Sequence, residues 1–342
     1  MGFKRKIISA FINILPYSFL RKNYVRLKKS KFADFLDQIY YEKFFKKSKV
    51  YLDFEGSIDK LKNSNKYCVI REGNWSYKVI NFCFVREMLS NIIWSIENGY
   101  IPVIDVYPDK SGVYKTHSNL WEKMFLQPFG KSFDDIKDKD YIICPVKSYV
   151  YSSVFDVFEL NKLDFWSRIV ERFLLFNNNC KKYIDDETDS IVTGKKVLAC
   201  LGRGTDYTDT KPKGHPVQPS IEELLNKSEE LINKYTYEYI YLATEEKRIA
   251  DAFKGRFYGK ILENNRNYYD ADYEQSSFNR ISQVNFGRED DDFLKSLEYF
   301  SSINILAHCD SLVAGLCGGS EFAVYFNGNK YRECYLFDKG RY

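Results

Sequence analysis

The chain has 342 residues, enough for two domains of ordinary size. Its hydrophobic content of 44% supports packed cores and excludes wholesale disorder, and a net charge of only +4 argues against a strong nucleic-acid binder. Eight cysteines are scattered without a Cys-x-x-Cys pair, and there are only three histidines. A zinc site is therefore disfavoured, and buried free thiols in a reducing cytosol are the economical interpretation.

The first 31 residues form a basic, partly apolar segment. Lys4-Arg5-Lys6 precede an apolar span at residues 7–20, and a second basic cluster follows it. The span has 14 residues, below the roughly 20 needed to cross a bilayer, and no small-residue cleavage site precedes the second cluster. Two interpretations of residues 1–31 stay open: an amphipathic segment on an anionic membrane surface, or a first helix with a solvated basic face. The chain is predicted to be cytoplasmic, in the first case at the inner face of the membrane.

Residues 32–190 carry the signals of a first α/β domain, on the acceptor side. Charged helix is expected at 32–66, with a turn at 54–57. The apolar patterns then predict a strand, a helix, two strands and a helix, at residues 67–70, 79–96, 100–105, 141–146 and 161–176. The first three of these elements make a βαβ unit. The polar residues 177–190 are predicted to be the linker, so the domain boundary is placed at 190.

Residues 191–342 repeat the alternation of strands and helices. Strands are predicted at 197–201, 239–244, 261–262, 311–314 and 331–338, and helices at 221–235, 249–253, 293–308 and 321–327. Ser220 with Glu223 makes a capping box for the first helix. Asp290-Asp-Asp292 contains an Asp-x-Asp pattern that suits a metal ion. Acidic residues that begin a helix are the favoured interpretation, because the helix dipole stabilises them.

Polar residues follow two of these strands where they end. The first strand breaks into Gly202-Arg203-Gly204-Thr205-Asp206, and the second is followed by Glu245-Glu246. Ligands of open α/β sheets bind outside the carboxyl ends of the strands, where an arginine can clamp a phosphate. A simple ion pair of Arg203 with Asp206 is an equally open interpretation. The acidic pair suits a ribose or a base edge, or merely a solvated helix start.

Three motifs in this half resemble one enzyme family. They are Arg203-Gly-Thr-Asp206 with a later His215-Pro216, then Tyr241-Leu-Ala-Thr-Glu-Glu246, then Gly315-Leu-Cys-Gly-Gly-Ser320. Residues 190–338 resemble the donor domain of the α-1,6-, α-1,2- and protein O-fucosyltransferases. The family pattern is roughly His-x-Arg-Arg-Thr-Asp, a later His-Pro, and Tyr-Leu-Ala-Thr-Asp-Asp. The family is inverting and of GT-B type, uses GDP-fucose and needs no metal.

The resemblance implies roles for matching positions. Arg203 would hold the donor diphosphate and stabilise the departing nucleotide, and Asp206 would be the acidic residue of that motif. Glu245 and Glu246 would lie near guanosine. The remaining donor-binding positions that the resemblance implies are Gly202, Gly204, Thr205, His215, Gly318, Gly319 and Ser320, the last three in a loop that meets the phosphates.

The chain departs from the family pattern at three positions. Leu201 replaces the leading histidine, and Gly204 replaces the second arginine. The acidic residue proposed as general base in the α-1,6 enzymes falls at Lys211, which cannot act as a base while protonated. Asp209 is the substitute base, and Glu72 is a second alternative.

The sequence therefore predicts an α/β protein of GT-B type, with two Rossmann-like domains facing a cleft and the donor in the C-terminal one. The predicted activity is inverting, metal-independent transfer of a sugar, L-fucose from GDP-fucose, to a hydroxyl of a surface-polysaccharide or lipid-linked glycan. No cofactor besides the donor substrate and no nucleic-acid partner is expected. A GT-B transferase with another nucleotide-sugar and a non-catalytic scaffold that binds glycans or nucleotides remain the alternatives.

Overall fold

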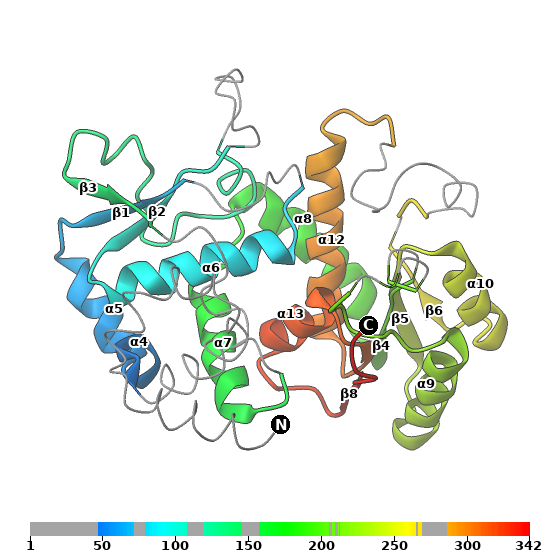
Figure 1. The fold of residues 1–342 in the computed structure, drawn as a ribbon. Helices are drawn as coiled ribbons and strands as arrows, with labels where there is room; N and C mark the ends of the chain where they lie inside the picture. Colours follow the sequence, from blue (N-terminus) through cyan, green and yellow to red (C-terminus); the bar gives the residue numbers. More distant parts are fainter. Residues whose placement is uncertain are drawn as a thin grey trace. The chain divides into compact units, whose positions relative to one another are not determined.

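The computed structural model describes residues 47–71, 79–107, 119–145, 157–204, 207–208, 211, 213–264, 266–268 and 286–342. The predicted basic segment 1–31 lies outside the described residues, as do Glu72, Thr205, Asp206 and Asp209. The chain divides into two compact units (Figure 1). The described residues of the first unit are 47–71, 83–107, 119–145, 157–165 and 172–175, and those of the second are 79–82, 166–171 and 176–342 with the gaps given above.

The first unit contains a parallel three-stranded sheet in the order β2-β1-β3. Its strands are β1 (Tyr67–Ile70), β2 (Ile101–Ile104) and β3 (Tyr141–Ile143), and its helices include α4 (Lys49–Leu52), α5 (Phe54–Lys62) and most of α6 (Phe82–Glu97). β1, α6 and β2 form the βαβ unit expected from the sequence, and Gly99 ends the helix with φ +80°. β1 is followed by Arg71, whose Nε donates to Asp105 Oδ2 at 2.9 Å.

The turn predicted at residues 54–57 is wrong. Helix α5 begins at Phe54 and runs through this segment. The break lies one residue earlier, where Asp53 caps the helix and accepts a hydrogen bond from the Gly56 N–H at 3.0 Å. The glycine thus lies inside the first turn of a helix, where a cap offsets its low helix propensity.

The second unit contains a parallel five-stranded sheet in the order β6-β5-β4-β7-β8. Its strands are β4 (Val197–Gly202), β5 (Tyr239–Thr244), β6 (Ile261–Leu262), β7 (Ser311–Gly315) and β8 (Cys334–Phe337). In sequence the third, second, first, fourth and fifth strands are thus neighbours, which is the order of a doubly wound dinucleotide-binding sheet. With the first unit's sheet, this confirms the predicted α/β class with two parallel sheets.

Helices cover the five-stranded sheet (Figure 1). Most of them were predicted from the sequence. Every residue of β4 is buried, because α9 (Ile221–Tyr235) and α10 (Lys247–Arg256) pack on the side of Leu198 and Cys200. Helix α12 (Asp291–His308) contacts β4 and β5 and packs on α8 (Asn178–Val192) and α13 (Gly318–Asn327). The capping box of Ser220 and Glu223 forms as predicted.

The linker predicted at 177–190 is wrong, because nearly all of it is helix α8. Its polar composition hides a helical period: Cys180, Ile184, Thr188 and Ile191 are buried along one face. Asn177 caps the helix by accepting a hydrogen bond from the Cys180 N–H. The whole helix belongs to the second unit, so the division between the units precedes it.

None of the helices in the described ranges is long and apolar enough to span a membrane. The eight cysteines all lie in these ranges, none forms a disulfide bond there, and six are buried. Asp291 at the start of α12 forms ion pairs with Arg288 and Lys295. Across the same ranges, no group of three or more His, Cys, Asp or Glu side chains gathers closely enough to hold a metal ion.

Candidate functional site

The candidate site lies at the carboxyl ends of the central strands of the five-stranded sheet. In register, Gly202 at the end of β4 pairs with Thr244 of β5, and Leu201 pairs with Ala314 of β7. The strand order reverses between β4 and β7, since later strands are added on opposite sides of β4. Doubly wound sheets bind their ligands at this reversal, outside the carboxyl ends of the strands. Arg203 follows β4 at this point.

Arg203 is held by a carboxylate on one side and an aromatic ring on the other. Its Nη1 donates to Glu245 Oε2 at 2.9 Å, and its guanidinium carbon lies 5.0 Å from the centre of the Tyr207 ring. Tyr207 in turn packs edge-on against His215, with 5.2 Å between the ring centres. The arginine side chain is 19% exposed, so it lies at the surface of the site and not in the packed interior.

The observed carboxylate partner of Arg203 is therefore Glu245, which follows the neighbouring strand. The alternative interpretation of an ion pair with Asp206 involves a residue outside the described ranges. A guanidinium has five N–H donors. The pair with Glu245 uses one of them in a partly exposed position where a phosphate oxygen could take the place of the carboxylate oxygen.

The two adjacent glutamates have different environments. Glu245 has a side chain that is 35% exposed, whereas Glu246 is 4% exposed and accepts a hydrogen bond from Arg248 Nε at 2.5 Å. A Cβ atom on Gly204 would lie 1.8 Å from Glu246 Oε1, far inside contact distance. The Glu246 carboxylate thus occupies the space that a side chain at position 204 would take, so a larger residue there would have to displace it, which gives a physical reason for glycine at this position.

Gly202 and Gly315, the last residues of β4 and β7, are also closely packed. A Cβ on Gly202 would lie 2.9 Å from Ile249 Cγ2, and a Cβ on Gly315 would lie 2.3 Å from Gln218 Oε1. Gln218 is buried, and its Nε2 donates to the Leu316 carbonyl at 2.7 Å. This glutamine ties the segment before α9 to the end of β7. No local sequence signal could predict this role, because the contact joins residues far apart in the chain.

Gly318, Gly319 and Ser320 form the first turn of α13, three residues before the predicted helix start. Ser320 Oγ is fully buried, lies 2.8 Å from the Gly315 carbonyl, and accepts a hydrogen bond from the Cys317 N–H at 2.9 Å. The hydroxyl therefore closes the turn between β7 and the helix. Any contact of this turn with an anion would come from backbone N–H groups, which carry the positive end of the helix dipole.

Tyr299 on α12 lies beside this turn and was not predicted as a site residue from the sequence. A Cβ on Gly319 would be 3.2 Å from the Tyr299 hydroxyl, so the glycine leaves room for the ring. Burial raises the pKa of Tyr299 well above its ordinary value; the neighbouring Cys317 and Glu245 raise it further, whereas Arg203 lowers it. The phenol is thus a neutral hydrogen-bonding group near both Arg203 and the start of α13.

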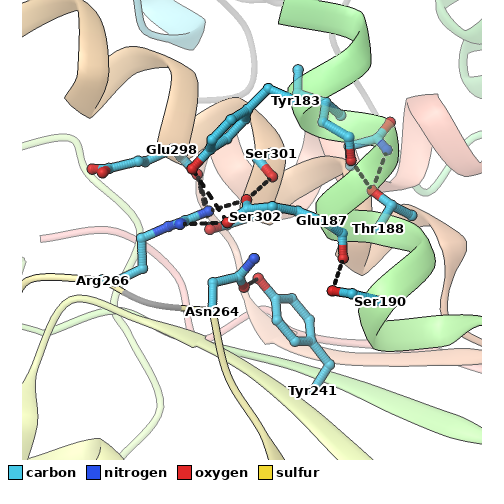
Figure 2. Close-up of polar contacts among 12 residues, drawn as sticks. Tyr183, Glu187, Thr188, Ser190, Tyr241, Asn264, Arg266, Glu298, Ser301 and Ser302 are labelled. Carbon is cyan, nitrogen blue, oxygen red and sulfur yellow. Dashed lines mark hydrogen bonds and ion pairs between the residues drawn. The ribbon is translucent and has the colours of Figure 1, made fainter.

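A polar network supports the same unit between α8, α12 and the segment after β6 (Figure 2). Arg266 donates two hydrogen bonds to Glu187, at 3.0 and 2.7 Å, and one to the Glu298 carbonyl at 3.2 Å. Ser301 also donates to Glu187, and the buried Tyr241 of β5 donates to Asn264, as the same view shows. Burial disfavours the ionised form of Glu187, but Arg266 and Ser301 outweigh it and lower the pKa of the carboxyl.

The predicted site residues that the structure describes thus fall into two groups. Arg203 pairs directly with Glu245 and is joined to His215 through Tyr207, while the others support the backbone around them. The supporting residues are Gly202, Gly204, Glu246, Gly318, Gly319 and Ser320. Thr205, Asp206 and Asp209 lie outside the described ranges, so their predicted roles stay predictions.

No protein-family model matches this sequence, and no curated protein is found as its relative. The solved structures to which the chain is similar include several fucosyltransferases. One is fucosyltransferase NodZ from Bradyrhizobium, with 13% identity, 77% of this chain and 93% of that chain covered, and a TM-score of 0.42. Another is a mutant of FUT1 from Arabidopsis thaliana in complex with GDP, with 7% identity, coverage of 83% and 74%, and a TM-score of 0.48. NodZ soaked with GDP-fucose matches at 13% identity, coverage of 80% and 96%, and a TM-score of 0.43.

Proposed function

We propose that this protein is an inverting glycosyltransferase that binds a nucleotide-sugar, GDP-fucose in the first instance, at the reversal point of the five-stranded sheet. The observation that carries the proposal is the position of Arg203. Its guanidinium follows β4 where the strand order reverses, and β7, the neighbouring strand, leads into the glycine-rich first turn of α13. A guanidinium and a helix N-terminus are two groups that proteins commonly use to hold a diphosphate.

The proposed reaction needs few groups. The acceptor oxygen attacks the anomeric carbon of the sugar, the bond from that carbon to the phosphate oxygen breaks, and the nucleoside diphosphate leaves with the electron pair. Arg203 and the N–H groups of α13 stabilise the charge that develops on the diphosphate. The acceptor proton passes to a carboxylate, for which Asp209 is proposed, with Glu72 as the alternative.

Nucleotide binding tests the proposal directly. GDP, UDP, CDP and ADP are compared by thermal unfolding and calorimetry. At a concentration of 100 times the dissociation constant, a nucleotide stabilises the fold by about 2.7 kcal/mol. We expect GDP to bind the wild type and Arg203→Ala to lose this binding. Arg256→Ala is the matched control, because Arg256 is the last residue of α10 and forms ion pairs with Glu222 and Glu229 of α9. Equal GDP affinity of Arg203→Ala and the wild type would refute the site.

Turnover separates an enzyme from a binding scaffold. With GDP-fucose and a glycan acceptor, Arg203→Ala should lose about 2–4 kcal/mol of transition-state stabilisation, measured from kcat/KM. Asp209→Asn should bind donor normally but transfer it slowly, because only the proton acceptor is removed. A protein that binds GDP but turns over no nucleotide-sugar would favour the non-catalytic scaffold.

One observation favours a different donor as the second candidate. The family's second arginine is replaced by Gly204, and the space beside this glycine holds the Glu246 carboxylate. The donor side of the site therefore has one cation fewer and a buried acid in its place. A stronger stabilisation by UDP, CDP or ADP than by GDP would assign the site to that nucleotide.

We also propose that residues 1–31 bring the enzyme to an anionic membrane surface, where a lipid-linked acceptor would be found. The support is the pair of basic clusters around an apolar span. Co-sedimentation with vesicles tests this. We expect the protein to sediment with phosphatidylglycerol vesicles but not with phosphatidylcholine vesicles. If it stays in the supernatant to the same extent with both, the proposal is wrong.

A further inference from the structure

A short segment far along the chain pairs with the loop that carries His215. Residues 340–342, here called the brace, run antiparallel to residues 214–217, with a bridge between Pro216 and Arg341. Three backbone hydrogen bonds and one side-chain hydrogen bond join the two: Gly214 N–H to Tyr342 carbonyl at 3.0 Å, Tyr342 N–H to His215 carbonyl at 3.1 Å, Val217 N–H to Gly340 carbonyl at 2.9 Å, and Arg341 Nη1 to Gly214 carbonyl at 2.8 Å.

Besides the bonds to the brace, the Pro216 carbonyl of this loop accepts a hydrogen bond from Gln218 Nε2 at 3.3 Å. Residues 213–215 are exposed and Pro216 and Val217 are half-buried, so hydrophobic burial orders this stretch weakly. Backbone hydrogen bonds from the brace therefore supply much of its order. Only at Gln218, which is buried and bonded to Leu316, does the chain become part of the core.

A chain of contacts leads from the brace to the guanidinium of the candidate site. His215 lies edge-on to Tyr207 at 5.2 Å, and the Tyr207 ring lies under Arg203 at 5.0 Å. The Tyr207 N–H donates to the Gly204 carbonyl at 2.9 Å, so the ring is also tied to the backbone next to Arg203. Each step is a direct contact, and no step leaves the second unit.

We propose that the brace is a positioning element of the donor site: it holds His215 against Tyr207 and thereby presets the orientation of Arg203 for a diphosphate. The inference rests on the proposed function for the identity of the ligand, a nucleoside diphosphate. The coupling of the brace to Arg203 rests on the contacts given above. An arginine whose rotamer is fixed before binding loses less conformational entropy when the anion arrives, so preorganisation raises affinity without a new contact.

Two substitutions weaken the brace without touching the site. Gly340 has φ +81° and open space where a Cβ would lie, so Gly340→Val disturbs only the backbone conformation. Arg341→Ala removes the bond to the Gly214 carbonyl. Gly259→Val is the matched control, since Gly259 has φ +72°, equally open space and a place in the turn before β6. Arg341→Lys keeps a cationic donor, so it should lose less GDP affinity than Arg341→Ala.

The experiment compares the double variant Gly340→Val/Arg341→Ala with the control in two measurements. Amide exchange by NMR follows Gly214 and Val217, which bond the brace directly, and Tyr207, which does not. Calorimetry follows the affinity for GDP. We expect faster exchange at all three amides and a GDP dissociation constant raised about fivefold or more, as expected when a preset arginine becomes mobile. The thermal unfolding midpoint of the double variant should be close to that of Gly259→Val.

The outcomes separate the inference from the proposed function. If exchange quickens at Gly214 and Val217 but stays at the wild-type rate at Tyr207, the brace does not reach the site and the inference is overturned. An unchanged GDP affinity in the double variant overturns it equally. If the wild type binds no nucleotide, the proposed function fails, while the Tyr207 amide still decides whether the brace positions this part of the loop.

Discussion

The ion pair of Glu187 and Arg266 should contribute strongly to the stability of the second unit. The two side chains are 22% and 13% exposed and share two hydrogen bonds, while Ser301 donates to the same carboxylate. Removing one partner leaves the other charge poorly solvated. For a fully buried pair this costs about 3–5 kcal/mol, so a partly exposed pair should lose about 2–4 kcal/mol in Glu187→Gln or Arg266→Met.

A double-mutant cycle by urea unfolding measures the interaction itself. The double variant should be less destabilised than the sum of the single variants, with a coupling energy of about 1–3 kcal/mol. The pair Lys182–Asp186 on the same helix is the control, because both side chains are well exposed, at 76% and 65%. The same cycle there should give at most about 0.5 kcal/mol. A coupling energy for Glu187 and Arg266 no larger than this control would refute the reasoning.

The pH dependence gives an independent check. Burial raises the pKa of Glu187, but the bonds from Arg266 and Ser301 outweigh burial, and the net shift is downward from the ordinary value of 4.5. A carboxyl whose pKa is lower in the folded state stabilises the fold above the unfolded pKa and loses this contribution as pH falls through the folded pKa. The difference in unfolding free energy between the wild type and Glu187→Gln should therefore be constant near neutrality and shrink below about pH 4.5.

Three further outcomes are expected. Gly204→Ala should lower the thermal midpoint and cost about 1–3 kcal/mol in urea unfolding, because its Cβ would enter the space of the Glu246 carboxylate; wild-type stability would contradict this. Ser320→Ala should cost about 1–2 kcal/mol in the same assay, since its buried hydroxyl closes the turn before α13. The carboxyl of Glu223 should titrate by NMR at about pH 2, chiefly because Lys339 bonds to it, and should return towards 4.5 in Lys339→Ala. An unshifted titration in the wild type would be the contrary result.

The elements of the second unit were predictable where local signals agreed. The helix at Ile221–Tyr235 matches the prediction residue for residue, because an apolar period and a capping box begin at the same place. The strand Tyr239–Thr244 likewise has an apolar run bounded by polar residues. The helix at Asn178–Val192 was not predicted, because its charged composition masks the helical spacing of its few buried residues.

The strand end that precedes Arg203 was predictable from the local sequence, but the contacts of Arg203 were not. The glycines on both sides of Arg203 predicted the end of a strand, and β4 ends at Gly202. The pairing of Arg203 with Glu245 was not foreseen, because it joins two strand ends that are neighbours only in the folded sheet. For the same reason no local signal could show that a carboxylate from beyond β5 fills the space beside Gly204.

The contrast between Glu245 and Glu246 bears on how the donor would be recognised. Glu246 is buried and paired with Arg248, so a ligand could reach it only by displacing that pair and exposing the backbone of Gly204. Glu245 is the accessible acid, and it already holds Arg203.

A diphosphate that binds Arg203 would compete with Glu245 for the guanidinium, which would free the carboxylate to accept hydrogen bonds from another part of the same ligand. Phosphate binding and recognition of the nucleoside would then be coupled through one ion pair, so Glu245→Gln should alter the affinity for GDP more than the affinity for inorganic diphosphate. Equal changes for both ligands, measured by calorimetry, would show that Glu245 acts only on Arg203.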